Sequence, residues 1–140
     1  MSLLLDTNIL SELRKGARAN ARLRAWFDGV SAEEIYLSVL VMGELRRGVE
    51  LVRRRDSKQA AALERWLMRV DSDHADRILP VDGRVADQWG RLMAIRPGSV
   101  IDTLMAATAL VHGLVLATRN VKDVSWTGVS CFNPFEGASA

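Results

Sequence analysis

Three acidic residues occupy positions where a carboxylate could do chemistry. Asp6 ends the apolar run Leu3-Leu4-Leu5, which is typical of a short strand buried on both faces. Glu44 lies within a helical stripe of apolar residues, and Asp102 opens the most apolar helix expected in the chain. Carboxylate oxygens are ligands that Mg²⁺ and Mn²⁺ prefer. If these three acids meet at one edge of a parallel sheet, they form a site for such an ion.

Each acid also has a purely structural interpretation. Asp6 could cap the helix after the first strand, a role that Thr7 or Asn8 could also fill. Glu44 could pair with one of the many arginines, because an unpaired glutamate on an inward helix face is costly to bury. Asp102 could cap its own helix. The prediction of a metal site therefore depends on finding the three acids together.

The elements that would position these acids alternate between strand and helix along the chain. Strands are expected at residues 3–5, 35–39, 78–81, 114–117 and 129–132. Helices are expected at residues 9–15, 20–29, 41–52, 60–70, 85–93 and 101–111, and the stripe of the third consists of Val41, Leu45, Gly48 and Val52. This alternation predicts an α/β fold in three layers, α/β/α, with a central parallel sheet of four to five short strands.

Length and composition predict one globular domain. The chain has 140 residues, of which 49% are hydrophobic, so we expect a single domain over residues 1–136 and a flexible tail over residues 137–140. No apolar run is long enough to cross a membrane, and the first residues are too few for a secretory signal, so a cytoplasmic location is expected. Almost all basic residues are arginine, which suits phosphate groups and indicates a nucleic-acid partner.

Four sequence blocks resemble those of a known family. They are Leu-Leu-Asp-Thr-Asn at residues 4–8, Glu-Leu-Arg-Arg-Gly at 44–48, Asp-Thr-Leu-Met-Ala-Ala-Thr-Ala at 102–109 and Leu-Ala-Thr-Arg-Asn at 116–120. In this order they resemble the PIN domain, and most closely its VapC and FitB type, the toxins of bacterial toxin–antitoxin pairs. The resemblance covers nearly the whole chain and implies a PIN-like three-layer fold.

The resemblance also implies roles for individual residues. It assigns the metal-binding and catalytic acids to Asp6, Glu44 and Asp102. It assigns supporting roles near the metal to the hydroxyls of Thr7 and Thr118, and to Asn8 as a residue that braces the first acid.

The fourth acidic position of the family falls on asparagine in this chain. Asn120 is its direct counterpart and is included in the catalytic set, because its carbonyl oxygen can coordinate a cation or position a water, although it adds no negative charge. Asp123, three residues later, could supply the missing carboxylate or could cap the turn before Val124. A weaker second metal site would follow from this departure.

The function that the resemblance implies is that of a metal-dependent endoribonuclease, the toxin of a type II toxin–antitoxin system. Such a hydrolase uses a water activated by Mg²⁺ or Mn²⁺ to cleave RNA phosphodiester bonds. The implied partners are an RNA substrate, a cognate antitoxin and a second copy of the chain as a homodimer, with operator DNA reached only through the antitoxin and no membrane involved.

Two other functions are compatible with the sequence. The chain could be a catalytically weak PIN-like module that acts within a toxin–antitoxin complex on DNA, an interpretation favoured by Asn120. It could also be another Mg²⁺-dependent phosphohydrolase. Phosphatases that form an aspartyl phosphate need a second aspartate two residues after the first, however, and Asn8 occupies that place.

Overall fold

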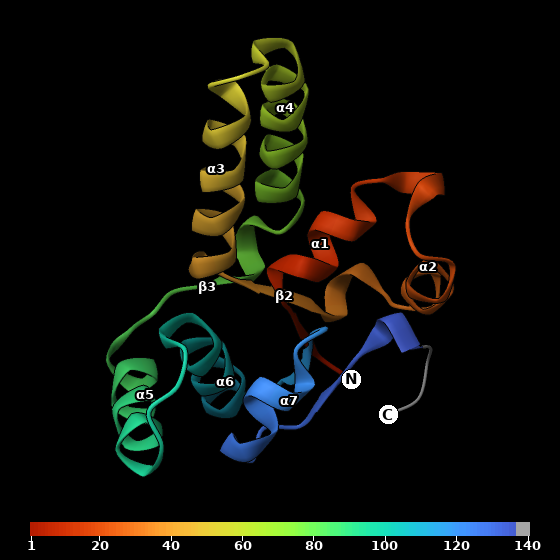
Figure 1. The fold of residues 1–140 in the computed structure, drawn as a ribbon. Helices are drawn as coiled ribbons and strands as arrows, with labels where there is room; N and C mark the ends of the chain where they lie inside the picture. Colours follow the sequence, from red (N-terminus) through yellow and green to blue (C-terminus); the bar gives the residue numbers. More distant parts are fainter. Residues whose placement is uncertain (137–140) are drawn as a thin grey trace.

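Five parallel strands form one sheet at the centre of the protein (Figure 1). The structure is a computed structural model that describes residues 1–136, so the expected tail at residues 137–140 lies outside the described residues. The strands are β1 (Leu3–Leu5), β2 (Ile35–Ser38), β3 (Ile78–Leu79), β4 (Val115–Ala117) and β5 (Cys131–Phe132). Their order is β3-β2-β1-β4-β5, and every neighbouring pair is parallel. The predicted α/β class and parallel sheet are confirmed.

The first strand of the chain lies in the middle of this sheet. Leu3 pairs with Ile35 of β2 on one side and with Val115 of β4 on the other. All three leucines of β1 are no more than 2% exposed, because helices cover both faces of the sheet. This central position explains the uninterrupted apolar run and places the next residue, Asp6, at the carboxyl edge of the sheet.

Helices flank the sheet and connect its strands (Figure 1). They are α1 (Thr7–Leu13), α2 (Ala21–Asp28), α3 (Val39–Arg53), α4 (Ser57–Asp73), α5 (Gly83–Ile95), α6 (Val100–His112) and the short α7 (Val121–Val124). Helices α3 and α4 form an antiparallel hairpin that projects from the sheet, while α5 packs beside α6. In the described part of the chain, no helix combines the length and the apolar character needed to span a membrane.

Some predicted details of the helices and strands are wrong, and β3 and β5 are each two residues shorter than expected. The first helix ends at Leu13 rather than near Lys15, and a 3₁₀ turn follows at Gly16, whose φ of 61° suits a glycine. The second strand ends one residue early, because the Ser38 hydroxyl accepts the Leu40 N–H and begins α3. Within α3, Gly48 is exposed and Val49 is buried, so the inward stripe runs one residue later at that turn.

Candidate active site

Asp6 is held at the end of β1 by hydrogen bonds to both of its carboxylate oxygens. Oδ1 accepts the backbone N–H of Thr7 at 2.8 Å and so caps α1. Oδ2 accepts the Thr118 hydroxyl at 2.7 Å and lies 3.5 Å from the Asn8 amide nitrogen. The capping interpretation of Asp6 is thus correct for one oxygen, whereas Thr7 and Asn8 lie inside the helix and do not cap it. Asp6 is only 8% exposed, and its position is fixed.

Glu44 reaches the same edge of the sheet from α3. The Thr7 hydroxyl donates a hydrogen bond to Glu44 Oε1, which ties α3 to the start of α1. An ion pair with arginine was the structural alternative for Glu44, and no ion pair among residues 1–136 involves it. Glu44 is therefore a half-buried carboxylate held by a hydroxyl group rather than by a positive charge.

Asp102 lies in the first turn of α6, and it is not the cap of that helix. The cap is Ser99, whose hydroxyl accepts the Asp102 backbone N–H, so the predicted alternative for Asp102 is wrong. The pKa of the Asp102 carboxyl is raised above its usual range, first by burial and then by the negative charges of Asp6, Asp123 and Glu44. Three other carboxylates thus act on the one at Asp102.

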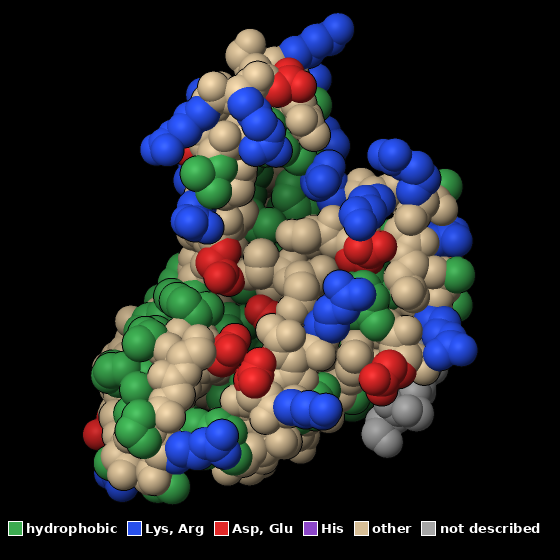
Figure 2. Space-filling view, viewed as in Figure 1, with side chains coloured by type: hydrophobic (Ala, Val, Ile, Leu, Met, Phe, Trp, Pro, Cys, Tyr) green, Lys and Arg blue, Asp and Glu red, His purple; other side chains and the backbone are tan. Residues whose placement is uncertain are grey.

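These four residues, Asp6, Glu44, Asp102 and Asp123, are called the acidic cluster from here on. Acidic side chains gather in the hollow between α3, α6 and α7 (Figure 2). None of the four forms an ion pair with any residue in the described range 1–136. The cluster is a concentration of negative charge that the described side chains leave uncompensated.

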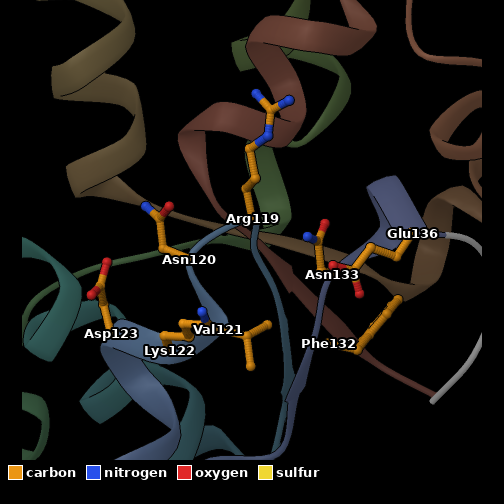
Figure 3. Close-up of a pocket in the computed structure, with 8 residues that line it drawn as sticks. All are labelled: Arg119, Asn120, Val121, Lys122, Asp123, Phe132, Asn133 and Glu136. Carbon is orange, nitrogen blue, oxygen red and sulfur yellow. The ribbon is translucent and has the colours of Figure 1, made fainter.

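Asn120 and Asp123 come from the loop after β4 and from α7. Their side chains point in the same direction, away from Asn133 and Glu136, which follow β5 (Figure 3). The charge of Asp123 contributes to the raised pKa of Asp102, whereas Asn120 carries no charge that could do so. Asp123 is therefore the fourth carboxylate of the cluster, and Asn120 lies beside it.

The loop after β4 is fastened to the acidic cluster by its backbone and by Thr118. Thr118 is 1% exposed, and its oxygen donates to Asp6 while accepting the Asn120 N–H at 3.0 Å. The Asn8 side chain bridges the two segments, because its amide nitrogen faces Asp6 and its Oδ1 accepts the Arg119 N–H at 3.3 Å. The residues expected to support the first acid are thus placed around it.

The acidic cluster fits a divalent cation by the chemistry of its donors. All of the charged groups are hard carboxylate oxygens, and burial followed by the repulsion of the other three carboxylates raises the pKa of Asp102. In the described chain, no three acidic, histidine or cysteine side chains are close enough to one another to enclose an ion as they stand. The carboxylates would therefore have to close around a cation, which would replace their repulsion with attraction.

Two hollows that the sequence did not indicate border the acidic cluster. One, of about 560 Å³, is lined by Arg119, Asn120, Val121, Lys122, Asp123, Phe132, Asn133 and Glu136 (Figure 3). The other, of about 200 Å³, lies between α1 and the α3–α4 hairpin and is lined by Thr7, Ser11, Arg14, Glu44, Leu45, Gly48, Val49, Val52, Leu63 and Trp66. Each hollow combines residues from separate elements, and which residues face it depends on how those elements pack, so sequence spacing did not reveal it.

Comparisons with known proteins agree on one family. The profile of the PIN domain matches residues 3–122. The chain is 34% identical over 138 residues to Toxin FitB of Neisseria gonorrhoeae, covering 95% of this chain and 98% of that one. It is 35% identical over 141 residues to VapC ribonuclease Y4jK of Sinorhizobium fredii, covering 97% and 99%. The crystal structure of FitAcB from Neisseria gonorrhoeae superimposes with a TM-score of 0.86 at 34% identity, covering 95% and 98%.

Proposed function

The chain belongs to the PIN-domain family as a toxin of the VapC and FitB type, and we propose that its acidic cluster hydrolyses RNA with Mg²⁺ or Mn²⁺. The observation that carries this proposal is the gathering of acidic side chains in the hollow between α3, α6 and α7, where Thr118 and the α1 backbone hold Asp6 and the Thr7 hydroxyl holds Glu44. The raised pKa of Asp102, caused first by burial and then by the charges of Asp6, Asp123 and Glu44, agrees with this arrangement. Four acids without positive partners at the carboxyl edge of a parallel sheet lower the stability of the fold, and the same arrangement favours the binding of a cation.

Each residue of the site has a task in this proposal. Asp6 is a fixed ligand, because Thr118 and the α1 backbone hold both of its oxygens. Glu44 is oriented by the Thr7 hydroxyl, and Asp102 and Asp123 would add two further carboxylates to the cation's ligands. A divalent cation held there supplies an activated water and positive charge for the hydrolysis of a phosphodiester. No side-chain nucleophile is required.

The activity is tested with purified protein free of any antitoxin. We expect cleavage of single-stranded RNA in Mg²⁺ or Mn²⁺, none in chelator, and recovery when the cation is restored. Cleavage that persists in chelator would show that the acidic cluster does not act through a cation. Intact RNA under all of these conditions would favour the catalytically weak binding module instead.

We infer that the antitoxin covers the hollow between α1 and the α3–α4 hairpin. This hollow has an apolar wall, formed by Leu45, Val49, Val52, Leu63 and Trp66, and it also borders Glu44. A solved relative, FitAB, is bound to a DNA fragment. An antitoxin segment with apolar side chains would fill the hollow and bring an arginine or lysine to Glu44 and Asp102, displacing the cation. Operator DNA would then be contacted through the antitoxin.

Gly48 offers a direct test of this antitoxin surface. Gly48 lines this hollow, and a Cβ added there meets no atom within 4 Å, so a larger side chain at this position begins in open space beside the hollow. We expect Gly48→Leu to weaken inhibition by the cognate antitoxin, with Gly43→Leu as the control, because Gly43 is equally open but does not line the hollow. Equal inhibition of both variants would place the antitoxin elsewhere.

We infer that a second copy of the chain covers the apolar surface on α5 and the loops beside it. Ile95 is 76% exposed and Val100 51% exposed, and hydrophobic side chains spread over α5 and α6 in Figure 2. Such a surface is typical of a protein interface. Light scattering should give a dimer for the wild type and a monomer for Ile95→Lys, while a monomeric wild type would contradict the inference.

A further inference from the structure

We propose that the 560 Å³ hollow beside α7 binds a nucleotide of single-stranded RNA that flanks the bond to be cut, with Arg119 and Lys122 against its phosphates. This inference rests on the proposed ribonuclease function and assigns a substrate site to that function. The hollow is large enough for a nucleotide, since sites for small organic ligands have volumes of about 300–1,000 Å³.

The hollow shares a wall with the acidic cluster. Asn120 and Asp123 line it, and Asp123 also acts on Asp102 of the cluster. The loop that forms this wall is rigidly joined to the first acid through Thr118. A strand whose phosphate reaches the cluster therefore extends directly into the hollow at the next nucleotide.

The basic side chains of the hollow compensate for the charge of the cluster. Four carboxylates repel a polyanion, so the substrate must be held by positive charge close beside them. Arg119 and Lys122 line the hollow, and neither forms an ion pair with any residue from 1 to 136. The Arg119 guanidinium lies 4.2 Å from the centre of the Phe135 ring, and its charge contributes, after Lys15 and the Asn20 N–H, to the lowered pKa of Glu12. Arg119 therefore lies at the edge of the hollow, and Lys122 is the cation that is free for a phosphate inside it.

The opposite end of the hollow suits a base and a sugar rather than a phosphate. Asn133 Oδ1 accepts the Phe135 N–H at 3.0 Å, which orients the amide so that its NH₂ group can donate to a base. Glu136 supplies a carboxylate that repels phosphate but accepts hydrogen bonds from a base amino group or a ribose hydroxyl. An unstacked nucleotide can enter such a hollow, whereas a base within a duplex cannot.

The experiment measures the binding of a fluorescent single-stranded RNA by anisotropy, in chelator so that the strand remains intact. We expect Lys122→Ala to weaken binding several-fold and to reduce the slope of log K against log salt by about one. Arg54→Ala is the matched control, because it removes one positive charge from the exposed end of α3, outside this hollow. Its slope and affinity should match those of the wild type.

A second pair of variants separates a phosphate contact from a loss of folding. Arg119→Lys retains a cation but loses the planar fork, so it should bind more weakly with the salt slope retained. Asn133→Ala should alter the preference among homopolymeric RNAs while leaving the slope unchanged. Melting curves verify that each variant is folded.

The outcomes distinguish this inference from the function on which it rests. If the wild type cleaves RNA in Mg²⁺ but Lys122→Ala and Arg54→Ala have the same affinity and slope, the hollow is not a substrate site and the ribonuclease stands. If the wild type neither binds nor cleaves RNA, the proposed function itself is wrong.

Discussion

Helix α3 carries two groups of charged side chains that differ in how their charges are compensated. On its exposed side lies the hairpin network, which joins α3 to α4 and consists of Arg46, Glu50, Arg53 and Glu64. Its ion pairs span 2.5 to 3.1 Å, and the arginines lower the pKa of both glutamates. Towards its beginning, α3 carries Glu44 into the acidic cluster, where burial and like charges raise the pKa of Asp102.

The hairpin network shows that this chain pairs glutamates with arginines at a place where they serve stability, whereas the acidic cluster has no such partner in the described residues. Arg46 lies two residues after Glu44, so it projects from the opposite side of α3, where it pairs with Glu50 and Glu64. A fold optimised for stability alone would give the acidic cluster such a partner as well, because like charges in a partly buried site oppose folding. We therefore expect the missing positive charge to come from outside the chain, as the proposed cation or as a basic residue of an antitoxin.

Catalysis should separate the two groups most strongly. Asp102→Asn removes a charge from the acidic cluster and should lower kcat/KM for RNA by about a hundredfold or more, as the loss of a preorganised charge-stabilising group does. Glu64→Gln makes the equivalent change in the hairpin network and should leave the rate unchanged. Equal losses for the two variants would mean that activity follows folding rather than the cluster.

Double substitutions sharpen the same contrast. Asp6→Asn and Glu44→Gln should each lower the rate by about a hundredfold or more, and combining either with Asp102→Asn should add little, because the acids act as one unit. Single-turnover rates of the three singles and two doubles provide the measurement. Multiplicative losses would assign the acids to separate steps.

Binding of Mg²⁺ should give the next largest effect. A ligand that binds only the folded state at a hundred times its dissociation constant stabilises it by about 2.7 kcal/mol. For a domain of this length that raises the Tm by roughly 5–15 °C. We expect this rise in the wild type and in Glu64→Gln, and a much smaller one in Asp102→Asn. A rise of the same size in all three would place the cation outside the acidic cluster.

The pH dependence of stability in chelator should have opposite signs for the two groups. The raised pKa of Asp102 means that the folded protein binds its proton more tightly than the unfolded chain does. Stability contributed by Asp102 is therefore present at low pH and falls as the pH rises above about 4. The lowered pKa of Glu64 gives the reverse, with a contribution present at neutral pH and lost as the pH falls through the folded pKa.

Urea denaturation between pH 3.5 and 7 measures these slopes. Relative to the wild type, Asp102→Asn should gain stability towards neutral pH, and Glu64→Gln should lose it. If the Asp102→Asn curve runs parallel to that of the wild type, the carboxylates do not repel one another in the folded protein.

The smallest effect should be that of salt on the hairpin network. Exposed ion pairs contribute little and are screened by salt. The Tm of Glu64→Gln should therefore lie slightly below that of the wild type at low salt and coincide with it in 1 M NaCl. A difference that persists at high salt would show that Glu64 stabilises the hairpin by packing rather than by charge.

Much of the fold follows from patterns within short segments. The apolar run before Asp6 and the alternation of strands and helices are local features, and they were sufficient to predict a parallel sheet of short strands. Boundaries were less accurate where a single hydroxyl decides them. Ser38 caps α3, although the pattern of apolar residues extended the preceding strand to residue 39. Ser99 caps α6, a role for which the sequence had suggested Asp102.

The acids could be proposed from sequence because each ends a strand or faces inward from a helix. Their mutual effects could not, since the charge of Asp123 on Asp102 depends on how α7 packs near α6. The hollow beside α7 was also beyond sequence reasoning. Arg119 and Asn133 come together only because β4 and β5 are neighbours in the sheet.

Because β1 lies in the middle of the sheet, the site can form only after the later strand β4 has been synthesised. Asp6 is synthesised long before its hydrogen-bond partner Thr118, which is 112 residues further along the chain. β1 gains its second neighbour only when β4 has been synthesised, and Asp123 follows later still. At about 5–20 residues per second, several seconds separate the synthesis of Asp6 from that of Asp123, so the acidic cluster is assembled well after its first member has been made.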